Sequence, residues 1–87
     1  MTYGLEVGEK LDKVFLKLAK KDRKQLEQIN KKISEIRESP SMGKPLKRPL
    51  QGRRRLHIGN FVLVYSVDEP RRVIKLLEYD HHDNVYR

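Results

Sequence analysis

The chain has 87 residues, no cysteine, and hydrophobic and charged fractions of 37% each, which predicts a single small domain over residues 1–87 with a thin core. The lack of cysteine excludes disulfides and thiolate metal sites, and no apolar run approaches the ~18 residues of a membrane span. A formal net charge of +8 favours an anionic partner such as nucleic acid. Because the first residues also lack the features of a signal peptide, we expect a cytoplasmic protein without membrane contact.

The first half of the sequence predicts a short strand followed by two helices. Apolar residues alternate over residues 3–7, as is typical of a half-buried strand. Residues 9–20 carry apolar side chains at helical spacing, with lysines on the remaining face. Asp22 followed by Gln25 resembles a capping box that begins a second helix, and Pro40 ends that helix. Because almost no residues separate the two helices, we expect them to form an antiparallel hairpin.

A loop with a dense group of basic residues follows the helices. Residues 39–52, the basic loop, contain three prolines and two glycines, a composition that favours loops. From Lys44 to Arg55, six of twelve residues are Lys or Arg, and none is acidic. Long loops in compact domains are usually functional or disordered. The basic content therefore favours contact with the phosphates of a nucleic acid, in and just after this loop, through Lys44, Lys47, Arg48, Arg53 and Arg54.

The second half of the sequence predicts three more strands, over residues 54–58, 61–67 and 72–79. Gly59-Asn60 is typical of a two-residue hairpin loop with a type II′ turn. The order strand, helix, helix, strand, strand, strand predicts an α+β fold. In this fold the helical hairpin packs on one face of a mostly antiparallel four-stranded sheet. The other face carries Arg55 and His57 and is left to form a groove.

The last nine residues, from Tyr79 to Arg87, hold two of the three histidines, two aspartates and two tyrosines. Histidine both gives and takes protons near neutral pH, so this segment indicates proton transfer on an anionic substrate. Adjacent residues in an extended segment point in opposite directions. We therefore expect only one of His81 and His82 in the site, and we select His82.

The same segment contains residue types that suit zinc, at positions Asp80, His81, His82 and Asp83. Contiguous residues are poorly placed to surround an ion tetrahedrally without a more distant ligand such as His57. The sequence therefore predicts no metal site and no cofactor.

Two stretches of the chain resemble the RelE/ParE superfamily of toxins from toxin–antitoxin systems. The first runs from Leu46 to Tyr65 and contains Gly-Arg-Arg-Arg-Leu-His-Ile-Gly-Asn-Phe; the second is His-His-Asp-Asn-Val-Tyr, ending at Tyr86. The predicted order of elements is also similar over the whole chain. The resemblance implies a RelE-like fold and a ribosome-dependent mRNA endonuclease that makes the 2′-hydroxyl attack the adjacent phosphate. It further implies a cognate RelB-like antitoxin that wraps the toxin.

Matched position by position, the resemblance implies four catalytic residues: Arg55, His57, His82 and Tyr86. Arg55 and His57 fall on the two basic positions of the strand motif. His82 falls where some members carry a histidine assigned to proton transfer, and Tyr86 falls on the C-terminal tyrosine. Val62 departs from the pattern because the family usually has a catalytic arginine there. Either Arg53, Arg54 or Lys47 supplies that charge, or the protein is a weaker enzyme.

Val62 also keeps a second function open. The protein could be a non-catalytic ParE-like module that inhibits a topoisomerase, or an inactive toxin homologue that only binds its antitoxin. His82 together with Tyr86, the basic loop and the net charge of +8 favour the ribonuclease. Its partners would be the ribosome and mRNA, in addition to the antitoxin.

Overall fold

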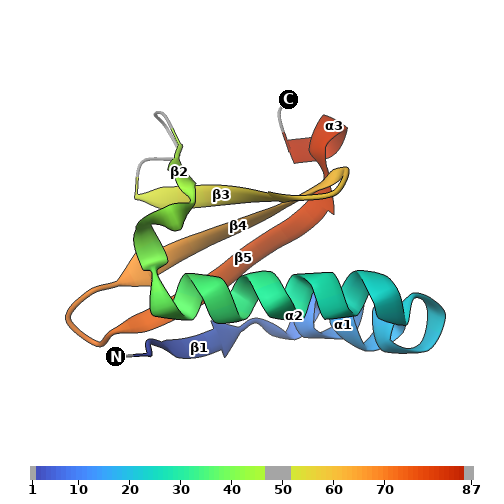
Figure 1. The fold of residues 1–87 in the computed structure, drawn as a ribbon, viewed down its shortest axis with the longest axis horizontal. Coiled ribbons are helices and arrows are strands. Elements are labelled where there is room, and N and C mark those ends of the chain that lie inside the picture. Colours follow the sequence, from blue (N-terminus) through green and yellow to red (C-terminus); the bar gives the residue numbers. More distant parts are fainter. Residues whose placement is uncertain (1, 47–51, 86–87) are drawn as a thin grey trace.

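The computed structural model describes residues 2–46 and 52–85. In chain order the elements are β1 (Gly4–Val7), α1 (Glu9–Lys21), α2 (Arg23–Glu38), the 3-10 helix η1 (Pro40–Met42), β2 (Lys44–Pro45), β3 (Arg53–Ile58), β4 (Phe61–Asp68), β5 (Val73–His81) and α3 (His82–Val85). Both long helices lie on the same side of the sheet (Figure 1). The predicted α+β fold is therefore confirmed. None of the helices in residues 2–46 and 52–85 is long and apolar enough to cross a membrane.

The sheet has five strands in the order β1-β5-β4-β3-β2, whereas four were predicted. β1 pairs with β5 in parallel, and the other pairs are antiparallel. The additional strand, β2, has two residues and lies at the edge of the sheet within the basic loop. Proline is accepted at such an edge because it needs no ladder partner for its nitrogen. So short a strand leaves no periodicity in the sequence, which explains the error.

The helical hairpin forms as its sequence predicts. Asp22 ends α1 and begins α2, and its carboxylate accepts a hydrogen bond from the Gln25 backbone N–H at 3.1 Å. This contact satisfies one of the unpaired N–H groups at the start of α2. The buried side chains of α2 are Ile29, Ile33 and Ile36, so the apolar stripe of this helix faces the sheet.

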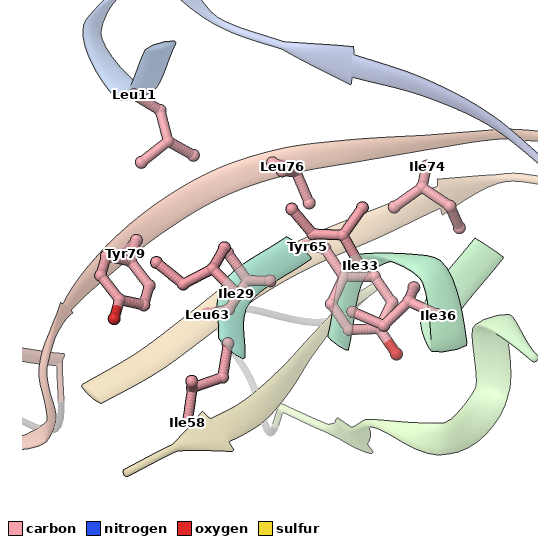
Figure 2. Packing of buried hydrophobic residues seen from close by; sticks show 10 residues of the cluster. All are labelled: Leu11, Ile29, Ile33, Ile36, Ile58, Leu63, Tyr65, Ile74, Leu76 and Tyr79. Atoms are coloured by element: carbon pink, nitrogen blue, oxygen red, sulfur yellow. The ribbon is translucent and has the colours of Figure 1, made fainter. Parts of the chain in front are cut away.

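The core lies between the helices and one face of the sheet. Figure 2 shows its ten buried residues: Leu11, Ile29, Ile33, Ile36, Ile58, Leu63, Tyr65, Ile74, Leu76 and Tyr79. They come from α1, α2, β3, β4 and β5. Burial of these side chains is the main favourable contribution to folding, and it fixes which face of each strand turns away from the helices.

Tyr65 attaches η1 and β2 to the core. Its ring is fully buried, and its hydroxyl donates to the Pro40 carbonyl at 2.8 Å and accepts from the Gly43 N–H at 3.0 Å. A side chain at Gly43 would bring its Cβ to 2.8 Å from the Arg55 carbonyl oxygen, so this position requires glycine. The close approach places the next residue, Lys44, opposite Arg55.

Two irregularities set the geometry of the central strands. Gly59 adopts a φ of 62°, as the first central position of a type II′ turn requires. In β5 the pairing to β4 shifts between Val64 and Tyr65, because Leu77 is an extra residue on β5. This β-bulge lets Leu76 and Tyr79, three residues apart, both face the core.

Candidate nucleic-acid interface

Basic residues of β2 and β3 lie on the sheet face that turns away from the helices, which we call the open face. Lys44 pairs with Arg55, Arg55 pairs with Val64, and Val64 pairs with Glu78. Residues directly opposite each other on antiparallel strands project to the same side of a sheet. These four residues therefore form one row across β2, β3, β4 and β5.

Two further rows flank the first: Arg53–Ser66–Lys75 on one side and His57–Val62–Asp80 on the other. Four residues predicted from the sequence thus share the open face: Lys44, Arg53, Arg55 and His57. Lys75 adds a cation that sequence reasoning missed, and Glu78 and Asp80 add carboxylates at the β5 side. Because these cations stand side by side on neighbouring strands, the open face can bind consecutive phosphates of a nucleic-acid chain.

The middle of the open face is apolar. Val62 and Val64 are only 0% and 2% exposed, although they lie on the side away from the core cluster. Longer polar side chains flank both valines, from β3 on one side and β5 on the other. Position 62 therefore supplies no charge, and the cations of the open face come from β2, β3 and Lys75.

Arg54 lies apart from the other two arginines of β3. It pairs with Tyr65, which faces the core, and its guanidinium donates to the carbonyl of Gly43 at 2.7 Å and to that of Ser41 at 3.3 Å. Burial raises the pKa of the Tyr65 hydroxyl, with the Gly43 N–H and the Arg54 charge acting in the opposite direction. Through these two hydrogen bonds, Arg54 holds η1 and β2 in place.

The two adjacent histidines lie side by side, so the expectation that they point in opposite directions is wrong. β5 ends at His81 and α3 begins at His82, and the alternation of an extended strand stops between them. The ring centroids are 4.6 Å apart. The His81 ring also meets Phe61 edge-on, at 5.6 Å between ring centroids.

His82 is anchored to the turn between β3 and β4. Its backbone N–H donates to the Asn60 carbonyl at 3.0 Å, and its Nδ1 lies 3.2 Å from the same oxygen. A carbonyl oxygen only accepts hydrogen bonds, so Nδ1 carries a proton. The other nitrogen, Nε2, lies 3.0 Å from Asp83 Oδ1, and the side chain is 45% exposed. Nε2 is thus an accessible atom for giving or taking a proton, just past the strand that carries Asp80.

Three predicted site residues, Lys47, Arg48 and Tyr86, lie outside the described residues. A pocket of about 570 Å³ lies beside β5, between this strand and the helices α1 and α2. It is lined by Lys10, Leu11, Val14, Leu18, Gln25, Phe61, Leu77, Glu78, Tyr79 and Asp80. A second pocket, of about 400 Å³, includes Arg53 and Arg54 in its lining.

Several proteins with a similar sequence or a similar fold are named as toxins. A protein of Methanocaldococcus jannaschii that carries the toxin name RelE4 is 43% identical over 86 residues, which cover 98% of this chain and 92% of that protein. The fold matches the toxin–antitoxin complex RelBE2 of Mycobacterium tuberculosis with a TM-score of 0.80 and 23% identity, over 94% of this chain and 100% of the other. It also matches the free RelE toxin of Escherichia coli with a TM-score of 0.78 and 24% identity, over 97% and 87% of the two chains.

A family model agrees with these relatives. Residues 6–86 match the model of the ParE toxin of type II toxin–antitoxin systems of the parDE kind. The match includes both stretches that carry the sequence resemblance. The chain therefore belongs to the ParE toxin family, within the RelE/ParE superfamily, and is a toxin of a toxin–antitoxin system.

Proposed function

We propose that this toxin is a ribosome-dependent mRNA endonuclease. The observation that carries the proposal is the gathering of Lys44, Arg53, Arg55 and Lys75 on one sheet face, at the end of which His82 presents an accessible nitrogen. Cleavage of RNA by its own 2′-hydroxyl needs cations for the phosphate and groups that move two protons. The open face and the C-terminal segment together offer both.

Each group has a defined role in the proposed reaction. A base removes the proton of the 2′-hydroxyl, and His57 is the candidate because it lies on the open face. The 2′-oxygen attacks the adjacent phosphorus, and the bond from phosphorus to the 5′-oxygen breaks. His82 gives its proton to the leaving 5′-oxygen. The products are a 2′,3′-cyclic phosphate and a 5′-hydroxyl, so no water is consumed in this step.

The cations stabilise the charge on the phosphate during attack. Arg55 is the best placed, because it stands in the middle row between Lys44 and Val64, and guanidinium can bind two phosphate oxygens at once. Arg55 and its neighbours replace the charge that Val62 does not provide. Tyr86, from the family resemblance, remains a proposed member of the site.

We further propose a RelB-like antitoxin as the cellular partner. The similar M. tuberculosis structure is a toxin–antitoxin complex, and the pocket of about 570 Å³ beside β5 presents an apolar surface to solvent. The toxin's net charge of +8 favours an acidic partner. An amphipathic antitoxin segment can cover both the charge and the apolar surface.

The test is induction of the toxin in a bacterial host, followed by mapping of mRNA 3′ ends on translating ribosomes. We expect new 3′ ends within ribosome-bound codons soon after induction. Plasmid supercoiling is measured in the same cells, because the alternative is inhibition of a topoisomerase. Altered supercoiling without new mRNA ends would favour that alternative, for which Val62 is the motivating observation.

A further inference from the structure

We propose that His81, His82 and Asp83 form a binding site for a divalent transition-metal ion such as zinc. One ligand atom from each residue lies within 4.8 Å of the other two. The sequence predicted no metal site because adjacent residues are poorly placed to surround one ion. That argument applies only to an extended chain. Here the chain turns from strand to helix at His82, and the turn brings the three side chains together without His57.

The spacing of the ligand atoms fits a tetrahedral ion. Zinc binds imidazole nitrogen and carboxylate oxygen at about 2.0–2.2 Å, which places neighbouring ligand atoms about 3.3 Å apart. Asp83 Oδ1 lies 3.0 Å from His82 Nε2, and Asp83 Oδ2 lies 3.5 Å from His81 Nδ1. With either Asp83 oxygen as the ligand, one edge of the coordination polyhedron is therefore already formed, and the third ligand atom lies within 4.8 Å of the other two.

The tautomers of both rings turn a lone pair toward Asp83. His82 Nδ1 donates to the Asn60 carbonyl, so the neutral ring has its lone pair on Nε2. His81 Nδ1 accepts from the Asp83 backbone N–H at 3.3 Å, so its lone pair is on Nδ1. The lone pair of His82 Nε2 and the Asp83 carboxylate oxygen 3.0 Å away repel each other unless a cation lies between them, and that cation is either a proton or a metal ion.

The surroundings of the ligands are also those of a metal site. A histidine that binds a metal usually gives its other N–H to a carbonyl or carboxylate, which fixes the ring. Asn60 has this role for His82. Asp80 Oδ1 accepts from the backbone N–H of His81 at 2.7 Å and from Asn84 Nδ2 at 3.1 Å, and these bonds hold the turn. The ligand side chains are 37%, 45% and 74% exposed, so an ion can enter from solvent.

A bound ion has one consequence for activity, and this consequence rests on the proposed function. Zinc at His82 Nε2 occupies the atom that is proposed to carry the proton for the leaving 5′-oxygen. Zinc should therefore inhibit mRNA cleavage, and a chelator should restore it. The metal site itself does not depend on cleavage.

The experiment is a calorimetric titration of zinc into the metal-free, full-length protein near neutral pH. We expect one zinc ion per chain, and a thermal unfolding temperature that rises with zinc. Asp83→Asn and His81→Gln should each weaken zinc binding by at least about tenfold, since even loss of a group that only supports a ligand costs that much. His57→Gln is the matched control, because His57 is the remaining histidine and lies outside the group.

Unchanged zinc affinity in Asp83→Asn, or an equal loss in His57→Gln, would overturn the assignment. Circular dichroism of each metal-free variant shows whether it has folded, so a folded variant with intact affinity is decisive. The outcome is separate from that of the proposed function. Zinc binding without mRNA cleavage would support the site and contradict the nuclease, and cleavage without zinc binding would do the reverse.

Discussion

Three consecutive arginines at the start of β3 have different roles because a strand alternates its side chains. Arg53 and Arg55 lie on the open face, in rows with Ser66 and Val64. Arg54 points to the other side and donates to backbone carbonyls of the segment before β2. This alternation allows a test in which neighbouring positions serve as controls for one another.

Replacing Arg53 and Arg55 together by glutamine should weaken ribosome binding and flatten its dependence on salt. Each lost phosphate contact lowers the slope of log affinity against log salt by roughly 1. The measurement is ribosome binding at several salt concentrations.

Arg54→Gln is the control for this experiment. Its salt slope should match that of the unaltered protein, while its free energy of unfolding should fall by about 1–3 kcal/mol because hydrogen bonds from a charged group are lost. An equal change of slope in Arg54→Gln would place it on the RNA surface and contradict the division between the faces.

At the scale of single elements, local periodicity in the sequence was sufficient to predict both helices and the positions of Arg55 and His57. Three features depend on contacts between distant residues and could not be predicted. β2 forms because the Tyr65 hydroxyl holds Gly43. The bulge at Leu77 interrupts the alternation of β5, so a regular alternation of side chains does not predict that Glu78 and Asp80 lie on the open face. The turn after His81 depends on bonds from His82 to Asn60.

The contact of Tyr79 with α2 should make the fold sensitive to alkaline pH. Its hydroxyl donates to Gln25 Oε1 at 2.6 Å, and burial, with a smaller effect of the Asp22 charge, raises the pKa of Tyr79 to about 12. The unfolded chain ionises this tyrosine near pH ~10. The contribution of Tyr79 to stability is therefore complete below pH ~10, and it is lost as pH rises to about 12.

Urea unfolding between pH 8 and pH 12 measures this effect, with Tyr79→Phe as the comparison. The unaltered protein should lose up to about 2 kcal/mol more than Tyr79→Phe over this range, since one pKa unit corresponds to about 1.4 kcal/mol. Parallel pH curves for the two proteins would show that Tyr79 ionises normally in the folded state.

At the scale of the whole molecule, two surfaces meet at β5, because Glu78 and Asp80 lie on the open face and also line a pocket. The open face collects cations, and the pocket of about 570 Å³ lies between the helices and β5. The first suits RNA, and the second suits an apolar segment of a partner. Under the proposed function, an antitoxin segment in this pocket would lie partly on a surface that RNA does not use.

Leu77→Asp should weaken antitoxin binding without unfolding the toxin. Leu77 is 41% exposed and lines this pocket, so the added charge would be desolvated by an apolar antitoxin segment. The measurement is copurification and affinity of the pair after coexpression of the toxin with its proposed antitoxin. The control is Leu16→Asp, because Leu16 is 60% exposed and lies outside this pocket; equal binding by both variants would remove the pocket from the interface.

The central claim, that the open face and the C-terminal segment together cleave mRNA, is tested most directly by single-turnover cleavage on purified translating ribosomes. His82→Ala should reduce the cleavage rate by about two to four orders of magnitude and leave ribosome affinity almost unchanged, because the lost group acts only on the leaving oxygen. The products of the unaltered toxin should carry a 2′,3′-cyclic phosphate and a 5′-hydroxyl. Cleavage by His82→Ala at the unaltered rate, or mRNA left intact by the unaltered toxin, would contradict this account.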